Sequence, residues 1–132
     1  MADFAELRSI KDYREVIADK LNDLDVAILV LNAGYIIGGP FSELTDTEVE
    51  KHIQVNANHV VYLAKSMLCQ LSSRFESQNK KSALIMVSSN LSQVALPFIS
   101  CYCATKTFSS YLAEALRAEN IKKVDIIAYE AG

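Results

Sequence analysis

The amino-acid sequence predicts an α/β fold in which about three parallel strands form a doubly wound sheet with flanking helices. Helical and strand-like patterns alternate from residue 10 to the carboxyl end. The strand-like segments, such as residues 25–31, are apolar on successive positions, which is typical of parallel strands buried on both faces. Right-handed crossovers would then place helices on both faces of an open sheet.

Length and composition favour one ordered domain that spans residues 1–132. A chain of this length can bury one hydrophobic core. Hydrophobic residues make up 51% and charged residues 22%, with a mean hydropathy of +0.14, and this composition argues against disorder.

The first predicted helix covers about residues 10–22. Its apolar side chains recur at helical spacing, and Ser9 with Asp12 forms a capping box at its start. The first strand follows at residues 25–31, and it stops abruptly at residues 32–34.

A long second helical region begins after a loop that contains two glycines and a proline. Thr45 and Glu48 form a second capping box, and the helical pattern continues to about Phe75. We expect a break in this helix near Asn56, and a polar turn at residues 76–81 ends it.

The second half of the chain repeats the same alternation. Residues 83–87 form a second doubly buried strand. Ser100 is expected to cap a third helix that runs to about Asn120, and residues 124–129 form the last strand. Sheets of this type bind ligands beyond the carboxyl ends of their strands, which directs attention to residues 32–40, 88–98 and 130–132.

Tyr102 and Lys106 form the strongest chemical pair in these regions. They stand four residues apart on the third helix, so the phenol and the ammonium share one face. A nearby cation and a helix N-terminus both stabilise a phenolate, which makes Tyr102 a candidate proton donor to a carbonyl that accepts hydride. Ser89, at the end of the second strand, could hydrogen-bond the same carbonyl oxygen.

Taken together, these motifs resemble the short-chain dehydrogenase/reductase family over essentially the whole chain. The residues that carry the resemblance are Asn32-Ala33-Gly34, Asn56, Val87-Ser88-Ser89 and Tyr102-Cys103-Ala104-Thr105-Lys106. The resemblance implies a partial Rossmann-like domain that holds the catalytic half of such an enzyme. It also implies NAD or NADP as cofactor and a small-molecule carbonyl or alcohol as substrate.

The family's functional roles map onto matching positions of this sequence. By that resemblance, Tyr102 is the general acid/base, Ser89 positions the substrate carbonyl, and Asn56 anchors a proton-relay water. Lys106 would assist Tyr102 and hold the nicotinamide ribose. The implied cofactor-binding residues are Asp3, Asn32, Ala33, Gly34, Tyr102 and Lys106. Asp3 enters this set because residues 1–4 look like the end of the family's third strand.

Within the family, the chain is most similar to 17β-hydroxysteroid dehydrogenases and very-long-chain 3-oxoacyl-CoA reductases. This similarity rests on residues 24–30, Leu96-Pro97 and residues 102–108. It implies NADPH, a steroid or 3-oxoacyl-CoA substrate and an association with the endoplasmic reticulum.

The family's glycine-rich turn, which binds the pyrophosphate through backbone N–H groups, has no match in this sequence. The four glycines are Gly34, Gly38, Gly39 and Gly132. The first strand would lack its usual neighbour, so we expect another chain, or another segment of the same gene product, to cover the edge at residues 25–31. Self-association is a further expectation from the family.

Composition excludes several other functions. The net charge is -3, and no stretch gathers Lys and Arg with aromatics, so nucleic acid is not an expected partner. Cys69, Cys101 and Cys103 lack disulfide or metal-ligand spacing, which points to an intracellular, reducing compartment and to no metal site. No signal peptide or membrane span is expected within the chain. His52 and His59 receive no role.

Two alternatives to an oxidoreductase remain at this point. One is a non-catalytic family remnant that serves as a structural subunit of a larger complex. The other is a plain α/β binding domain with chance motifs, which the correct order of four motifs disfavours.

Overall fold

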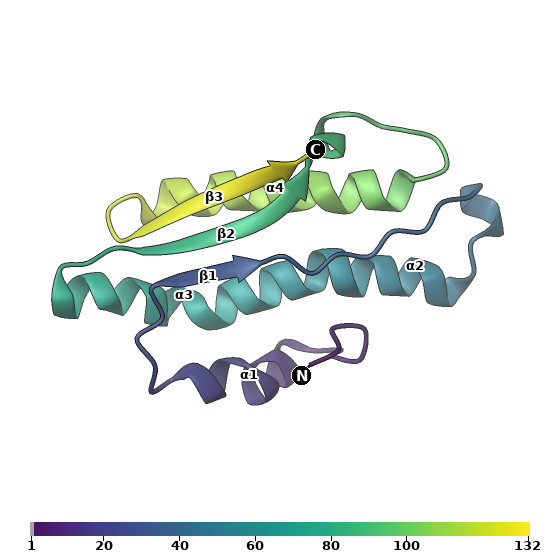
Figure 1. Ribbon diagram of the computed structural model, residues 1–132. Coiled ribbons are helices and arrows are strands. Elements are labelled where there is room, and N and C mark those ends of the chain that lie inside the picture. Colours follow the sequence, from purple (N-terminus) through teal and green to yellow (C-terminus); the bar gives the residue numbers. More distant parts are fainter. Residues whose placement is uncertain (1) are drawn as a thin grey trace.

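The computed structural model describes residues 2–132 and confirms the predicted alternation of helices and strands (Figure 1). The helices are α1 (Ile10–Val16), α2 (Asp46–Ile53), α3 (His59–Gln78) and α4 (Ser100–Asn120), with a π-helical turn η3 (Gln54–Asn58) between α2 and α3. The short 3₁₀ helices are η1 (Ala18–Leu21), η2 (Phe41–Glu43) and η4 (Asn90–Gln93). The strands are β1 (Ile28–Leu31), β2 (Ser82–Ser89) and β3 (Val124–Ala131).

The three strands form one parallel sheet in the order β1-β2-β3, which is a partial Rossmann-like arrangement. Leu31 of β1 pairs with Met86 of β2, and Ser89 of β2 pairs with Ala131 of β3. All three strands therefore end at the same edge of the sheet. The start of α4 and the loop after β1 lie beyond this edge (Figure 1), so the topology gathers the predicted site residues there.

Helices α3 and α4 cover one face of the sheet. Their apolar side chains pack with strand residues in a core made up of Leu7, Tyr13, Leu31, Val60, Leu63, Ala64, Leu71, Leu84, Met86, Ala113, Val124 and Ile126. Burying one side chain of this size stabilises the fold by roughly 1.5–3 kcal/mol. The alternation of buried and less buried positions along β2 and β3 shows that the core lies on this one face.

The opposite face of the sheet is open, and here the prediction of helices on both faces is wrong. Ile28 and Val30 of β1 are 62% and 50% exposed, and Ile127 and Tyr129 of β3 are 49% and 58% exposed. Helix α1 packs against α3 and leaves this face uncovered. From its sequence, β1 is expected to be buried on both faces, but no element among residues 2–132 covers its second face.

The first predicted helix ends earlier than expected. The capping box of Ser9 and Asp12 is present, as predicted. However, regular α-helix stops at Val16 because Ile17 adopts φ −126° and ψ −65°, and the chain continues to Leu21 only as the 3₁₀ helix η1. Strand β1 likewise begins at Ile28 rather than at residue 25.

The second helical region follows the prediction closely. Thr45 and Glu48 form the expected capping box at the start of α2. The break expected near Asn56 is the π-helical turn η3, which changes the winding without ending the helix. Helix α3 ends at Gln78, where Asn79 takes the left-handed conformation with φ 54°.

Helix α4 has the predicted bounds, but Ser100 does not cap it. Ile99 occupies the N-cap position and makes no side-chain capping bond, so Ser100 is the first helical residue. Strands β2 and β3 each extend beyond the predicted ranges, to Ser89 and Ala131.

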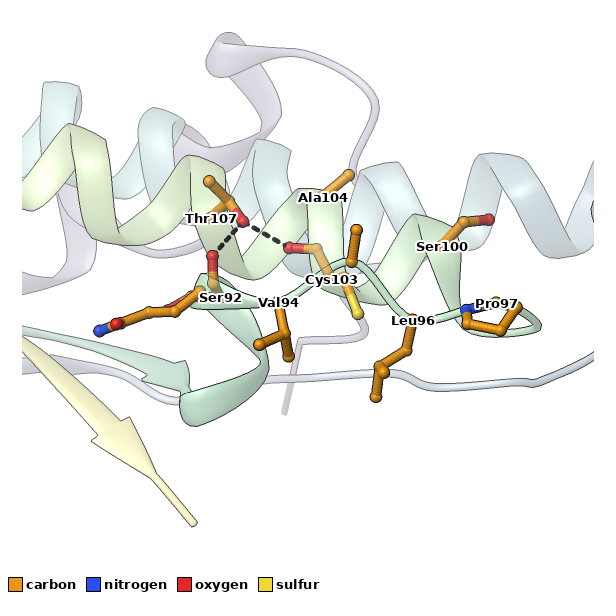
Figure 2. A pocket seen from close by; sticks show the side chains of 10 residues that line it. Ser92, Val94, Leu96, Pro97, Ser100, Cys103, Ala104 and Thr107 are labelled. Carbon is orange, nitrogen blue, oxygen red and sulfur yellow. Dashed lines mark hydrogen bonds between the residues drawn. The ribbon is translucent and has the colours of Figure 1, made fainter.

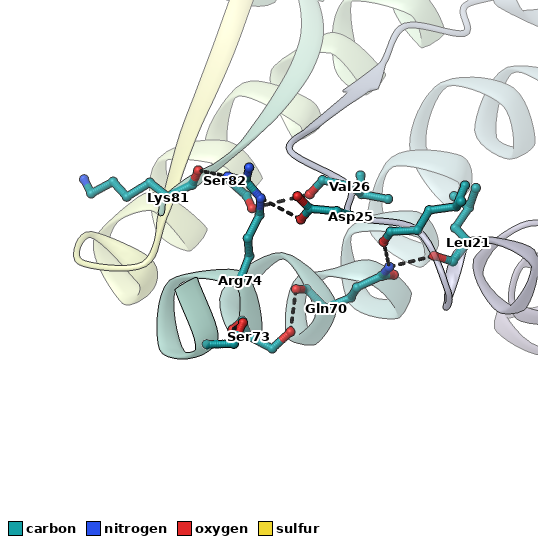
Figure 3. A network of polar contacts seen from close by, with 10 residues as sticks. Leu21, Asp25, Val26, Gln70, Ser73, Arg74, Lys81 and Ser82 are labelled. Carbon is teal, nitrogen blue, oxygen red and sulfur yellow. Dashed lines mark hydrogen bonds and ion pairs between the residues drawn. The ribbon is translucent and has the colours of Figure 1, made fainter. Parts of the chain in front are cut away.

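A polar network fixes the amino-terminal end of the sheet, opposite the predicted site (Figure 3). Arg74 of α3 pairs with Asp25 at 2.8 Å and donates to the backbone oxygen of Lys81 at 2.9 Å. Gln70 donates to the backbone oxygens of Leu21 and Leu24 at 2.7 and 3.0 Å. The hydrogen bond from Arg74 holds the pKa of the Asp25 carboxyl below its usual range.

Strand β1 pairs only with β2 among residues 2–132, so its outer edge carries no backbone partner in this part of the chain. Across the same residues, none of the helices combines the length and the apolar character that crossing a lipid bilayer requires.

Candidate active site

Tyr102 and Lys106 lie together in the first turns of α4. The Nζ atom of Lys106 is 5.6 Å from the centroid of the Tyr102 ring. The helical spacing of four residues places both side chains on one face of α4, as the sequence predicts. The ammonium therefore lies within electrostatic reach of the phenol.

Lys106 also links α4 to the end of β2. Its side chain is buried, with 4% of the residue exposed, and its Nζ donates to the backbone oxygen of Val87 at 2.8 Å. Burial lowers the pKa of the Lys106 ammonium because it penalises the charged form. The Val87 carbonyl offsets part of this penalty by accepting a hydrogen bond from the ammonium.

The two serines at the end of β2 have different partners. Ser88 donates to the backbone oxygen of Lys106 at 2.8 Å and accepts from the Ser110 hydroxyl at 2.8 Å. Ser89 accepts from the backbone N–H of Leu91 at 3.2 Å and donates to Asn90 Oδ1 at 3.3 Å. Ser88 thus fastens the strand to α4, while the hydroxyl of Ser89 caps η4 beside the carboxyl end of the sheet.

Asn56 is buried in the π-helical turn, and its side chain is almost fully engaged. Its Oδ1 accepts from the backbone N–H of Tyr35 at 2.7 Å. Its Nδ2 donates to the backbone oxygen of Tyr35 at 2.8 Å and to Thr105 Oγ1 at 3.2 Å. The amide thereby joins the loop after β1 to α4, and one lone pair of Oδ1 is left for a further hydrogen bond.

Gly34 lies beside both of these side chains. A Cβ atom at Gly34 would come 3.7 Å from Lys106 Nζ and 4.0 Å from Asn56 Oδ1. A side chain here would therefore be in van der Waals contact with the ammonium, and glycine keeps the loop backbone facing Lys106 without one. Asn32 and Ala33 precede Gly34 in the irregular segment that directly follows β1.

Asp3 differs from the expectation. Residues 2–6 form irregular backbone and turn rather than the end of a strand. The Asp3 carboxylate accepts from the backbone N–H of Ala5 at 2.9 Å, and its backbone oxygen accepts from Glu6. These bonds are local to the first turn; Met1, which the strand-end interpretation also used, lies outside the described residues.

His52 was given no role from the sequence, yet it contacts the site loop. Its Nδ1 donates to the backbone oxygen of Glu48 at 2.9 Å, and its Nε2 accepts from the backbone N–H of Ile37 at 3.3 Å. The sequence holds one signal for this contact. His52 stands four residues before Asn56, so both side chains lie on one face of the continuous helical segment formed by α2, η3 and α3.

The loop between β2 and α4 encloses a pocket of about 440 Å³ against one side of α4 (Figure 2). Val94, Leu96 and Pro97 line it from the loop, and Cys103 and Thr107 line it from the helix. The Thr107 hydroxyl is shared between the backbone oxygens of Ser92 at 2.6 Å and Cys103 at 2.9 Å, and this contact ties the loop to α4 (Figure 2).

Glu130 fixes the same loop from the end of β3. Its carboxylate accepts from the Ser92 hydroxyl at 3.0 Å and from Gln93 Nε2 at 2.9 and 3.2 Å. The η4 segment is therefore held from α4, from β3 and by the Ser89 cap. Because η4 directly follows β2, these contacts with α4 and β3 also hold the end of β2 in place.

The chain is similar in sequence to known enzymes. The family model for short chain dehydrogenases matches residues 1–132. The chain is 29% identical to 17-beta-hydroxysteroid dehydrogenase type 3 from Danio rerio over 116 residues, which are 84% of this chain and 36% of that protein. It is 30% identical over 101 residues to very-long-chain 3-oxoacyl-CoA reductase from Ajellomyces capsulatus (strain NAm1 / WU24), covering 75% of this chain and 28% of that protein.

Solved structures share the fold. The crystal structure of 3-ketoacyl-(acyl-carrier-protein) reductase from Brucella melitensis, complexed with NADH, matches with a TM-score of 0.83 at 20% identity. The match covers 98% of this chain and 53% of that chain. The chain thus spans about a third of the length of these two curated relatives and about half of the solved reductase.

Proposed function

The chain belongs to the short-chain dehydrogenase family, and from that premise we propose that it works as an NAD(P)-dependent oxidoreductase that interconverts a carbonyl and an alcohol. One observation carries the proposal. The ammonium of Lys106 lies 5.6 Å from the ring of Tyr102, beyond the carboxyl ends of parallel strands. Ligand sites of open α/β sheets occur at this position.

In this proposal Tyr102 carries out the proton transfer. A bound reduced nicotinamide supplies the hydride for carbonyl reduction. As the carbonyl oxygen gains negative charge, the Tyr102 hydroxyl transfers its proton to that oxygen, and in alcohol oxidation it accepts the proton. The Lys106 ammonium stabilises the phenolate that this transfer leaves behind, and its bond to Val87 holds it in place.

Ser89 and Asn56 have supporting roles in this proposal. The Ser89 hydroxyl would turn from its η4 cap toward the substrate and donate to the carbonyl oxygen. Asn56 would hold the loop after β1 through Tyr35, and the remaining lone pair of its Oδ1 would accept a bond from a relay water.

The residues beside Lys106 fit the nicotinamide half of a dinucleotide. A Cβ atom at Gly34 would lie 3.7 Å from Lys106 Nζ, so glycine leaves the loop backbone and the ammonium without a side chain that would shield them from a sugar ring. Lys106 and Tyr102 would hold the ribose, with Asn32, Ala33 and Gly34 along the cofactor. The hydrogen bond that the Asp3 carboxylate accepts from Ala5, two residues away, favours a role in its own turn over an adenine contact.

The pyrophosphate requires a glycine-rich turn that these 132 residues do not contain. We propose that another chain or segment supplies it and pairs with the outer edge of β1. The exposed apolar side chains of Ile28 and Val30 support such a partner, since apolar sheet faces and unpaired edges are normally covered. Self-association through other surfaces is compatible with this arrangement.

For the substrate, we propose an apolar carbonyl compound such as a steroid or a 3-oxoacyl-CoA, with NADP as cofactor. The names of the two curated relatives support the substrate class, and NADP follows from the resemblance of the sequence to this branch of the family. An association with the endoplasmic reticulum is a proposal that rests on the resemblance of the sequence to that branch. The free cysteines Cys69, Cys101 and Cys103 agree with a reducing compartment.

The test uses reduced nicotinamide mononucleotide (NMNH), a hydride donor that needs no pyrophosphate cradle. The purified chain would be mixed with NMNH and a panel of carbonyl compounds, namely a steroid ketone, a 3-oxoacyl thioester and a sugar ketone. We expect NMNH consumption with at least one apolar carbonyl. If no carbonyl is reduced, with NMNH or with NADPH, the oxidoreductase proposal fails and a purely structural role replaces it.

A further inference from the structure

His52 is fully buried between α2 and the loop after β1, and its two ring nitrogens have fixed roles. The exposed fraction of the residue is 0%. Because a carbonyl oxygen can only accept, the contact of Nδ1 with the Glu48 oxygen requires a proton on Nδ1. Because the N–H of Ile37 donates, Nε2 must present a lone pair. The geometry therefore selects the neutral imidazole with its proton on Nδ1.

His52 and Asn56 act on the same stretch of loop. Asn56 binds both backbone groups of Tyr35, and His52 binds the backbone N–H of Ile37. Residues 35 and 37 are two apart in the chain, and their N–H groups both point to the helical segment that carries His52 and Asn56. Two buried side chains one helical turn apart therefore hold three backbone groups, much as a neighbouring strand would.

We call the hydrogen bonds of His52 and Asn56 to residues 35 and 37 the clamp. The Tyr35 ring adds further contacts to it. His52 contacts the ring edge-on, with ring centroids 4.9 Å apart and an interplanar angle of 64°. Lys51 Nζ lies 4.6 Å from the centroid of the same ring. An aromatic pair and a cation–π contact both favour this position of the Tyr35 ring.

The clamped residues continue directly from Gly34, whose backbone lies beside Lys106 Nζ. The distance between the Gly34 backbone and the Lys106 ammonium therefore depends on how firmly residues 35–37 are held. Asn56 fixes only residue 35. Without an acceptor at position 52, the N–H of Ile37 would lose its partner and the loop could shift away from Lys106.

We propose that His52 is a positioning residue that sets the loop against Lys106 and thereby shapes the subsite for the nicotinamide ribose. This inference rests on the proposed function, because it assigns the loop to cofactor binding. His52 itself makes no contact with a reacting group in this arrangement. It acts through Ile37 and Tyr35.

The experiment compares His52→Leu, which removes the acceptor at similar volume, with His52→Gln, whose amide oxygen can accept from Ile37. His59→Leu is the matched control. His59 is also a buried histidine of the helical segment formed by α2, η3 and α3, but its ring packs against Phe4. Amide hydrogen exchange of Ile37 reports the clamp, and NMNH affinity by NMR titration reports the subsite.

We expect His52→Leu to raise the exchange rate of the Ile37 amide and to weaken NMNH binding, each by about fivefold to tenfold, the value of one hydrogen bond. His52→Gln should recover most of both, and His59→Leu should change neither. An unchanged NMNH affinity in His52→Leu, with faster Ile37 exchange, overturns the inference alone. A wild-type chain that binds no NMNH overturns the proposed function, and the inference with it.

A measurement on the wild-type chain remains decisive where a variant does not fold. Nitrogen chemical shifts of His52 should show the proton on Nδ1 and an unprotonated Nε2. The opposite tautomer would overturn the clamp, because Nε2 could then not accept from Ile37.

Discussion

Lys106 Nζ lies 5.6 Å from the centre of the Tyr102 ring and is held there by a 2.8 Å hydrogen bond to the Val87 carbonyl. The relationship therefore joins a helix to the end of a strand, and it does not depend on the flexible geometry of an exposed helical pair. A cation fixed in this way can stabilise a phenolate without first being ordered.

Replacement of Lys106 by Met should change how stability depends on pH. Burial lowers the pKa of Lys106 below its usual 10.5, so the folded chain binds fewer protons than the unfolded chain between these two values. Stability should therefore rise with pH across that window as the penalty for burying the charge disappears. Urea unfolding at several pH values up to 10.5 should show a smaller rise for Lys106→Met than for the wild type. If the stability of both proteins rose equally with pH, the lowered pKa of Lys106 would be contradicted.

His59 should destabilise the fold in acid. Burial lowers the pKa of His59 to about 4 from 6.5, and the positive charge of Lys106 acts in the same direction. Because the unfolded chain takes up the proton first as the pH falls through 6.5, stability is lost down to about pH 4. The expected loss between pH 7 and pH 5 is about 2 kcal/mol. In urea titrations, His59→Leu should remove this part of the loss; a variant with an unchanged acid response would refute the prediction.

Asn56→Ala should cost more stability than Asn58→Ala in the same π-helical turn. Asn56 makes three side-chain hydrogen bonds, two of them to the backbone of Tyr35. Asn58 makes one, to Gln54. Leaving the groups of Tyr35 without partners should cost about 2–4 kcal/mol, against about 1 kcal/mol for Asn58. Urea unfolding of both variants measures the difference, and equal losses would show that Asn56 does not anchor the loop.

Phe98 adopts a left-handed backbone conformation with φ 69° while its carbonyl accepts from the N–H of Gly39 at 2.8 Å. This conformation is costly for residues with a Cβ atom, and asparagine tolerates it better than alanine does. Phe98→Asn should therefore be more stable than Phe98→Ala by about 0.5–1 kcal/mol. The comparison by thermal or urea unfolding removes the ring in both variants, and an equal stability would argue against strain at this position.

Local patterns in the sequence predict much of the fold. The capping boxes at Ser9 and Thr45 and the bounds of α4 all follow from short-range preferences. The face shared by Tyr102 and Lys106 follows from helical spacing alone. These features depend on residues a few positions apart, which is why they can be read without knowledge of the tertiary structure.

The remaining features depend on long-range contacts. The apolar pattern of β1 indicates burial on both faces, but burial requires a covering layer, and residues 2–132 cover one face only. The contact of His52 with Ile37 is not predicted from the sequence, because Ile37 is fifteen residues away in the preceding loop. A lone histidine on a helix has no sequence signature for such a contact.

The most direct test of the central claim is the rate of carbonyl reduction by Tyr102→Phe with NMNH as hydride donor. Tyr111→Phe is the matched control, because Tyr111 is an exposed tyrosine on the same helix. Removal of the Tyr102 hydroxyl should slow the reduction at saturating NMNH by about 100-fold to 10,000-fold, while Tyr111→Phe reacts like the wild type. A Tyr102→Phe variant that reduces the carbonyl at the wild-type rate would contradict the proposed role of Tyr102 and Lys106.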